Sequence, residues 1–139
     1  MPGGYAIDMS RSLVLSRGWG MVTGALMLAH AEALAADIRF RPDMRQLVDL
    51  RAVTDLDITA ATMRQLAALS PFGPGARRAL IVGSDYVYGM ARMFQILRER
   101  AQDDLGVFRT APEAVQWLGL EAESETIMAA LEDVPGWLS

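Results

Sequence analysis

Two short apolar segments open the chain, and a long apolar segment follows them. The first two, Tyr5–Met9 and Leu13–Ser16, are separated by a polar break, a pattern that predicts two paired strands. The third runs from Gly24 to Ala36 with little polar interruption, and Thr23 precedes it in the position of a helix N-cap. The beginning of the chain therefore predicts a strand, a second strand and a helix.

A strand and a helix then alternate. Met44–Leu50 has the short apolar core of a strand, and the helical run after it, opened by an Asp57 or Thr59 cap, ends before Pro71. Ala79–Val82 is a continuous apolar run, which is typical of a strand covered on both faces.

The last two units follow the same order. Ser84 and Asp85 cap a helix, Gly106–Arg109 predicts the last strand, and Ala111–Leu118 predicts a helix that ends at Gly119. The packing face of the helix after Ser84 is expected on a stripe with three- and four-residue spacing, formed by Tyr86, Met90, Phe94, Leu97 and Ala101.

This order predicts an α/β domain with a mixed, mostly parallel sheet of about five strands and helices packed on it. Residues 1–120 are interpreted as the domain. Residues 121–139 carry five acidic groups and no basic one, and are interpreted as an acidic C-terminal extension with a helix over Glu123–Leu131.

Composition excludes several classes of site. The chain has 139 residues with no cysteine and one histidine, so it has no disulfide and no zinc site with sulfur ligands. Its 13 basic residues, all arginine, face 17 acidic residues, which argues against nucleic-acid binding. We expect no metal, no cofactor, no secretory signal and no transmembrane segment, and hence a cytoplasmic protein.

A candidate site lies where the third predicted strand ends. Asp49, Arg51 and Asp57 are expected to gather at its carboxyl end, where open α/β sheets place ligand crevices. Tyr86 and Tyr88 would line the same cleft, together with Arg92. The alternative is a salt-bridged loop that ties the strand to the next helix.

Other residues have simpler interpretations. His30 is interpreted as a partly buried, hydrogen-bonded residue rather than a catalytic base, and Ser84 as a helix cap rather than a nucleophile. The adjacent Arg77 and Arg78 indicate a solvated loop end. The apolar helix Gly24–Ala36 has a second apolar face that ordinary core packing, another helix, a second subunit or an apolar ligand could cover.

Three local sequences resemble the SpoIIAA-like family of the STAS and CRAL-TRIO-related proteins over roughly residues 5–120. They are Leu47–Arg51 at the end of the third strand, Tyr88–Phe94 in the third helix, and Val107–Arg109 leading to Ala114–Leu118. The resemblance implies a STAS-like fold.

The resemblance also implies a mode of action without chemistry. STAS proteins are mostly partner-binding switches in which a hydroxyl before the second helix is phosphorylated. Here Asp57 matches the preceding acid, Ile58 occupies the position of that hydroxyl, and Thr59 lies one place later. We therefore expect a non-enzymatic binding or regulatory module that acts on a protein partner or forms a dimer. The alternative is a carrier or sensor of a small apolar or lipid-like ligand.

Overall fold

The computed structural model describes residues 3–99 and 103–135. In these two ranges, five strands form one sheet in which neighbours in sequence are neighbours in space. β1 is antiparallel to β2, and all the other pairs are parallel. The strands are β1 (Gly3–Asp8), β2 (Leu13–Thr23), β3 (Arg45–Asp57), β4 (Arg77–Val82) and β5 (Asp104–Phe108).

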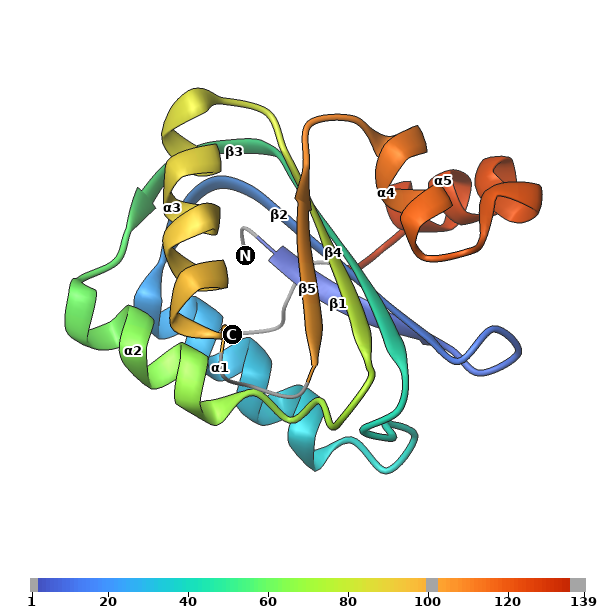
Figure 1. The fold of residues 1–139 in the computed structure, drawn as a ribbon, viewed down its shortest axis with the longest axis horizontal. Helices are drawn as coiled ribbons and strands as arrows, with labels where there is room; N and C mark the ends of the chain where they lie inside the picture. Colours follow the sequence, from blue (N-terminus) through green and yellow to red (C-terminus); the bar gives the residue numbers. More distant parts are fainter. Residues whose placement is uncertain (1–2, 100–102, 136–139) are drawn as a thin grey trace.

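The helices form a layer on each face of this sheet (Figure 1). Right-handed crossovers between parallel strands added in one direction place every connecting helix on the same face. That face holds α1 (Gly24–Ala36), α2 (Ala60–Leu69) and α3 (Asp85–Leu97). The other face holds α4 (Ala111–Trp117), the short 3₁₀ helix η1 (Glu121–Glu123) and α5 (Ser124–Glu132). The expected α/β class and mostly parallel sheet are confirmed.

Helix ends follow the predicted capping residues. The side chains of Thr23, Thr59 and Ser84 accept hydrogen bonds from backbone N–H groups in the first turns of α1, α2 and α3. Gly119, after α4, has a φ of 77°, a left-handed conformation that favours glycine and ends the helix. The predicted caps are therefore confirmed.

Two strands are much longer than the sequence pattern predicts. β2 continues from Ser16 to Thr23, and β3 continues from Leu50 to Asp57, so the two extensions pair with each other. The register shifts twice within this ribbon, and Gly20 has a φ of 64° at one of the shifts. Each register shift puts the apolar residues after it out of phase with those before it. The alternation of apolar and polar residues is interrupted there, so the sequence pattern does not reveal that the strands continue.

The packing face of α3 is rotated from the predicted stripe. Val87 and Ala91 are its buried residues, whereas Tyr86 and Leu97 are 52% and 41% exposed. Met90 and Phe94 of the predicted stripe face the sheet, together with Val87 and Ala91. Ala101, the last residue of the predicted stripe, lies outside the described residues.

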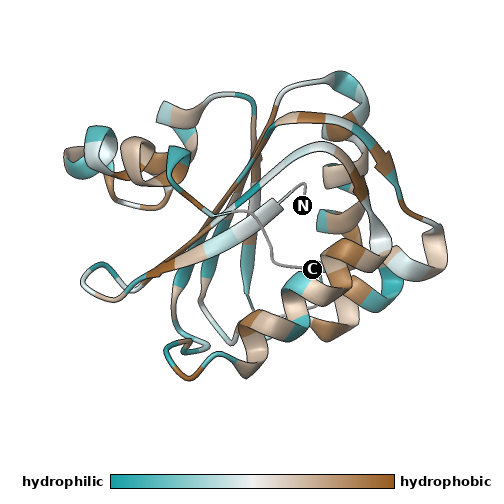
Figure 2. Ribbon diagram, turned by 180° about the vertical axis from the view of Figure 1, so that it is seen from behind, coloured by the Kyte–Doolittle hydropathy of each residue, from teal (hydrophilic) through white to brown (hydrophobic). Residues whose placement is uncertain are grey.

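Apolar residues recur along the strands and along the helices on both sides of the sheet (Figure 2). On the α4–α5 side, Leu13, Leu15 and Leu47 pack with Ile127 and Leu131 of α5. The described part of the acidic segment thus turns an apolar stripe to the sheet and leaves its glutamates in solvent.

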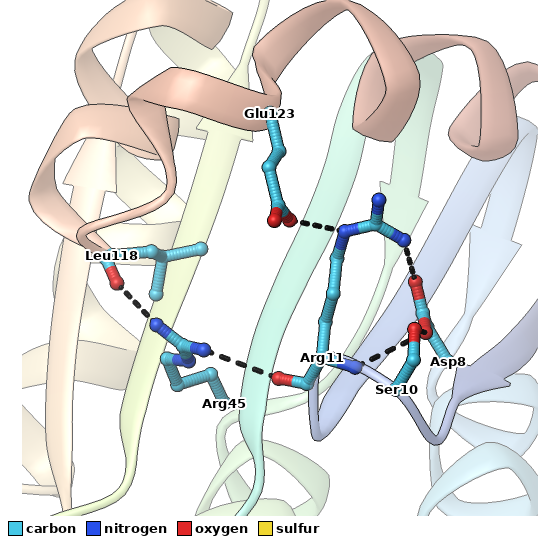
Figure 3. A network of polar contacts seen from close by, with 6 residues as sticks. All are labelled: Asp8, Ser10, Arg11, Arg45, Leu118 and Glu123. Atoms are coloured by element: carbon cyan, nitrogen blue, oxygen red, sulfur yellow. Dashed lines mark hydrogen bonds and ion pairs between the residues drawn. The ribbon is translucent and has the colours of Figure 1, made fainter.

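Two arginines anchor this helical layer at the β1–β2 turn (Figure 3). Arg11 donates to Glu123 and forms an ion pair of 2.6 Å with Asp8. Arg45 donates to the carbonyl oxygens of Leu118, at 2.9 Å, and of Arg11, at 3.1 Å. The loop after α4 is therefore fixed to the hairpin and to the start of β3.

The described ranges contain neither a membrane-spanning helix nor a cluster of metal ligands. None of these helices is both long enough and apolar enough to cross a membrane. Within the same residues, no group of three histidine or carboxylate side chains is placed to hold a metal ion.

Candidate functional site

A cavity of about 170 Å³ lies between the sheet and helices α1, α2 and α3. Its walls are mainly aliphatic and methionine side chains, with one aromatic ring from the loop after α2 and another from α3. They include Leu26, Met27, Val48, Leu50, Met63, Leu66, Phe72, Leu80, Met90 and Phe94. Methionine side chains adapt easily to the shape of a ligand because they are unbranched and flexible.

The two ends of the cavity differ in chemistry. Near the carboxyl ends of the strands, Val22 and Leu56 of the β2–β3 ribbon, together with Ile58, make an apolar end. Near the amino ends of β3 and β4, Gln46 and Arg78 make a polar end. The cavity is therefore amphipathic along the strand direction.

The polar end is a row of side chains across three neighbouring strands. Gln46 of β3 donates to Ser16 Oγ of β2 at 3.0 Å, and Arg78 Nε of β4 donates to Gln46 Oε1 at 3.0 Å. Gln46 and Arg78 are direct partners in the ladder. Arg78 Nη1 also donates to Ser70 Oγ, at 3.0 Å.

His30 of α1 meets this row from the helical side. Its Nε2 lies 2.9 Å from Ser16 Oγ, and its ring lies edge-on to Tyr5 with centroids 5.4 Å apart. Burial, and then the positive charge of Arg78, lower the pKa of His30 from 6.5 to about 4. The imidazole is therefore neutral at pH 7, and the interpretation of His30 as a partly buried, hydrogen-bonded residue fits this geometry.

A buried cluster of charges lies behind the polar row. Asp103, just before β5, has a fully buried side chain that forms an ion pair of 3.1 Å with Arg78. The other carboxylate oxygen of Asp103 pairs with Arg98, which follows α3. Burial lowers the pKa of Arg78 to about 10, and the charge of Asp103 opposes that change, so Arg78 stays cationic at pH 7.

Asp49 and Arg51 lie away from the cavity. They are in the middle of β3 rather than at its end, because the strand continues to Asp57; the expected placement at the carboxyl end is wrong. Asp49 pairs with Arg51 at 2.9 Å on the face that carries α4 and α5. Burial raises the pKa of Asp49, but hydrogen bonds from the Arg51 side chain and backbone outweigh it and lower the pKa below its usual range.

The other candidates form local contacts at the carboxyl end of the sheet. Thr59 caps α2, two residues after Asp57, the exposed last residue of β3. Tyr86 Oη donates to the carbonyl oxygen of Leu56 at 3.0 Å, which ties α3 to the ribbon. The ring of Tyr88 lies 4.3 Å below the guanidinium of Arg109.

The structure does not bring the seven candidates together. Arg92 donates to Gln95 on the exposed side of α3. None of Asp49, Arg51, Asp57, Thr59, Tyr86, Tyr88 and Arg92 lines the cavity in the described part of the chain. Their role in binding a partner stays a prediction.

Sequence reasoning missed Ser16, Gln46 and Arg78. The interpretation of Arg78 as a solvated loop end is wrong, because β4 begins at Arg77 and places Arg78 beneath the helices. A signal was present: Gln46 is in phase with Val48 and Leu50, and Arg78 is in phase with Leu80 and Val82, so both are polar residues at core-facing positions.

The Ser16 and His30 pair resembles part of a hydrolase triad, but its electrostatics oppose that chemistry. A general base works best with a pKa near the working pH. The low pKa of His30 makes the imidazole a weak base, and the nearby charge of Arg78 destabilises the imidazolium that proton abstraction would form. Both effects disfavour the activation of Ser16 by His30.

Comparisons with known proteins identify the fold. No protein-family model matches the chain, and no curated protein matches it. The structure is similar to the crystal structure of an uncharacterised DUF3478 protein from Shewanella loihica PV-4, with a TM-score of 0.55 over 84% of this chain and 93% of that chain, at 19% sequence identity. That protein has a SpoIIAA-like fold. The chain shares this SpoIIAA-like fold.

The SpoIIAA-like part of the sequence resemblance is confirmed as a fold, and the STAS and CRAL-TRIO relationships stay predictions. At this sequence identity the likeness concerns the path of the backbone, and function depends on the side chains that a fold carries.

Proposed function

We propose that this SpoIIAA-like domain binds a small, largely apolar molecule in the cavity between the sheet and α1–α3, without chemical turnover. The observation that carries the proposal is the amphipathic cavity itself: aliphatic walls, an apolar end at the ribbon, and a polar end at Gln46 and Arg78. Apolar pockets with a few convergent polar groups are typical of sites for small molecules.

A bound ligand would bury apolar surface of the cavity walls. A molecule that binds the folded domain and not the unfolded chain also stabilises the fold, so ligand binding should raise the free energy of unfolding.

The cavity volume limits the size of the ligand. An engineered apolar cavity of about 150 Å³ in another protein binds benzene. The cavity here, at about 170 Å³, therefore fits one ring or a short branched chain with a small substituent. Part of a long-chain lipid would have to lie outside this volume.

The distribution of side chains around helix α1 supports a ligand in the cavity. Met27, His30, Ala31 and Leu34 face the cavity. Apart from Glu32, the exposed positions are alanines, which favour helix and expose little apolar area: Ala25, Ala29, Ala33, Ala35 and Ala36. The second apolar face noted from the sequence is thus mostly alanine, and the larger Met27 and Leu34 pack in the apolar clusters around the cavity.

Filling the cavity is expected to abolish binding. We expect toluene, followed by amide chemical shifts in NMR titration, to bind the wild-type domain and to lose at least ten-fold in affinity in the variant Ala31→Phe, because the new ring occupies the cavity. The control is Ala35→Phe, an exposed position on the same helix, which should bind toluene as the wild type does. Equal binding by wild type and Ala31→Phe would place the site elsewhere.

Native mass spectrometry separates ligand binding from the partner-binding alternative. For the protein purified from its own host, we expect a small additional mass that is lost in Ala31→Phe. A ligand-free dimer would instead favour the interpretation from the sequence, in which Asp57 and Thr59 belong to a partner surface.

A further inference from the structure

We infer that the ligand of this cavity is a monoanion, a small apolar body with one carboxylate, and that Arg78 is the residue that binds the carboxylate. This inference rests on the proposed function, because it concerns the same cavity. Three observations support it: the excess of positive charge among the described residues at the polar end, the unused hydrogen-bond donor of Arg78, and the position of Arg78 in the cavity wall.

Among the described residues, the buried cluster holds two guanidinium groups and one carboxylate. Arg78 and Arg98 share the carboxylate of Asp103, and the side chains of these arginines are only 11% and 9% exposed. Within the same residues, the charges of Asp103 and Arg98 act on Arg78, and His30 nearby is neutral at pH 7. One carboxylate balances one of the two buried cations, so a ligand anion at this position would balance the other.

Arg78 also keeps a donor for that anion. Its Nε donates to Gln46, and its Nη1 donates to Ser70 and to Asp103. These contacts hold the guanidinium plane in place. Within the described residues, Nη2 has no hydrogen-bond partner. Arg98 adds to the shortage of acceptors, because its Nε is buried without a partner in the same part of the chain.

The position of Arg78 determines where in the cavity the carboxylate of the ligand would lie. The side chain lines the cavity at its polar end, and its guanidinium lies 4.5 Å from the centroid of the Phe72 ring. Aliphatic walls continue from there toward Leu56 and Ile58. A ligand with a carboxylate at Arg78 would therefore place its apolar body along the strands, toward the ribbon.

The neutral neighbours favour an anion over a cation. Gln46 and Ser16 are uncharged, and Tyr5 beyond His30 has its pKa raised to about 12 by burial and by Asp37. Asp49, the buried carboxylate of β3, lies on the opposite face of the sheet. A cation would thus meet Arg78 with only Asp103 to balance it, and Asp103 is already shared by two arginines.

The test compares benzoate with benzamide, which have the same shape and differ in charge. At pH 7 and fixed ionic strength, we expect benzoate to bind the wild-type domain roughly ten-fold tighter or more, the ratio that a hydrogen bond to a charged group contributes. In Arg78→Met this preference should disappear while toluene still binds. The control Arg77→Met removes the exposed neighbour, whose guanidinium lies over Trp117 on the other face, and should keep the preference.

A second measurement needs no variant and applies if Arg78→Met does not fold. In the wild-type domain, the side-chain Nε–Hε NMR signal of Arg78 should shift on addition of benzoate and stay in place with benzamide. Equal affinities for the two compounds, or a benzoate shift at Arg77 instead of Arg78, would overturn the inference and leave the proposed function intact. Failure of toluene, benzamide and benzoate alike to bind would overturn both.

Discussion

Replacing Asp103 with asparagine is expected to lower the free energy of unfolding by about 3–5 kcal/mol, the range seen when one partner of a buried ion pair is removed. The carboxylate of Asp103 is fully buried between Arg78 and Arg98. An amide keeps the shape of the side chain but leaves two buried guanidinium groups without a counter-charge. Urea unfolding of the variant and the wild type measures the difference.

The matched control for this substitution is the next residue. Asp104→Asn removes a charge from an exposed side chain at the start of β5 and is expected to change stability by less than about 0.5 kcal/mol. If Asp103→Asn and Asp104→Asn unfold at the same urea concentration, the buried cluster does not stabilise the fold, and the view of Arg78 as a fixed, paired cation fails with it.

Acid is expected to destabilise the domain through His30. The pKa of His30 is about 4 in the folded state and close to 6.5 in the unfolded chain. Between these two values the unfolded chain takes up a proton that the folded state does not, so the stability contributed by the neutral imidazole is present above pH 6.5 and is lost as the pH falls toward 4. The loss over this interval is at most about 3 kcal/mol.

The measurement compares unfolding free energies at pH 7 and pH 4.5 for the wild type and for His30→Gln. The variant lacks the titrating group, so its stability should fall less over the same interval, although carboxylates such as Asp49 act on both proteins as the pH approaches 4. Parallel stability curves for the two proteins would show that His30 titrates normally, in an environment more polar than the cavity described here.

The sequence predicts the order of elements well and the lengths of two strands poorly. Capping residues mark helix starts because the cap is a local interaction, so Thr23 and Ser84 were sufficient to place α1 and α3. The β2–β3 ribbon depends on pairing between distant segments, and its register shifts erase the alternation that would have extended β3 to Asp57.

The candidate site was less predictable for a related reason. The general rule places ligands at the carboxyl ends of parallel strands, and it directed attention to Asp49 and Asp57. In this fold the β2–β3 ribbon and Tyr86 close that end with apolar and backbone contacts. The polar groups lie toward the other end, where the adjacent Arg77 and Arg78 indicate a solvated loop end by sequence alone, although only Arg77 is exposed.

The side chains of the polar row come from distant parts of the sequence. Ser16 and Gln46 are 30 residues apart, Gln46 and Arg78 are 32 apart, and Arg78 and Asp103 are 25 apart. Contacts between such distant residues form slowly, since a long loop must close for each of them. The Asp103 contact therefore forms only once β5 has docked beside β4, so that a nascent or clipped chain ending before Asp103 would keep the walls of the cavity and Arg78 without the carboxylate that holds its guanidinium in place.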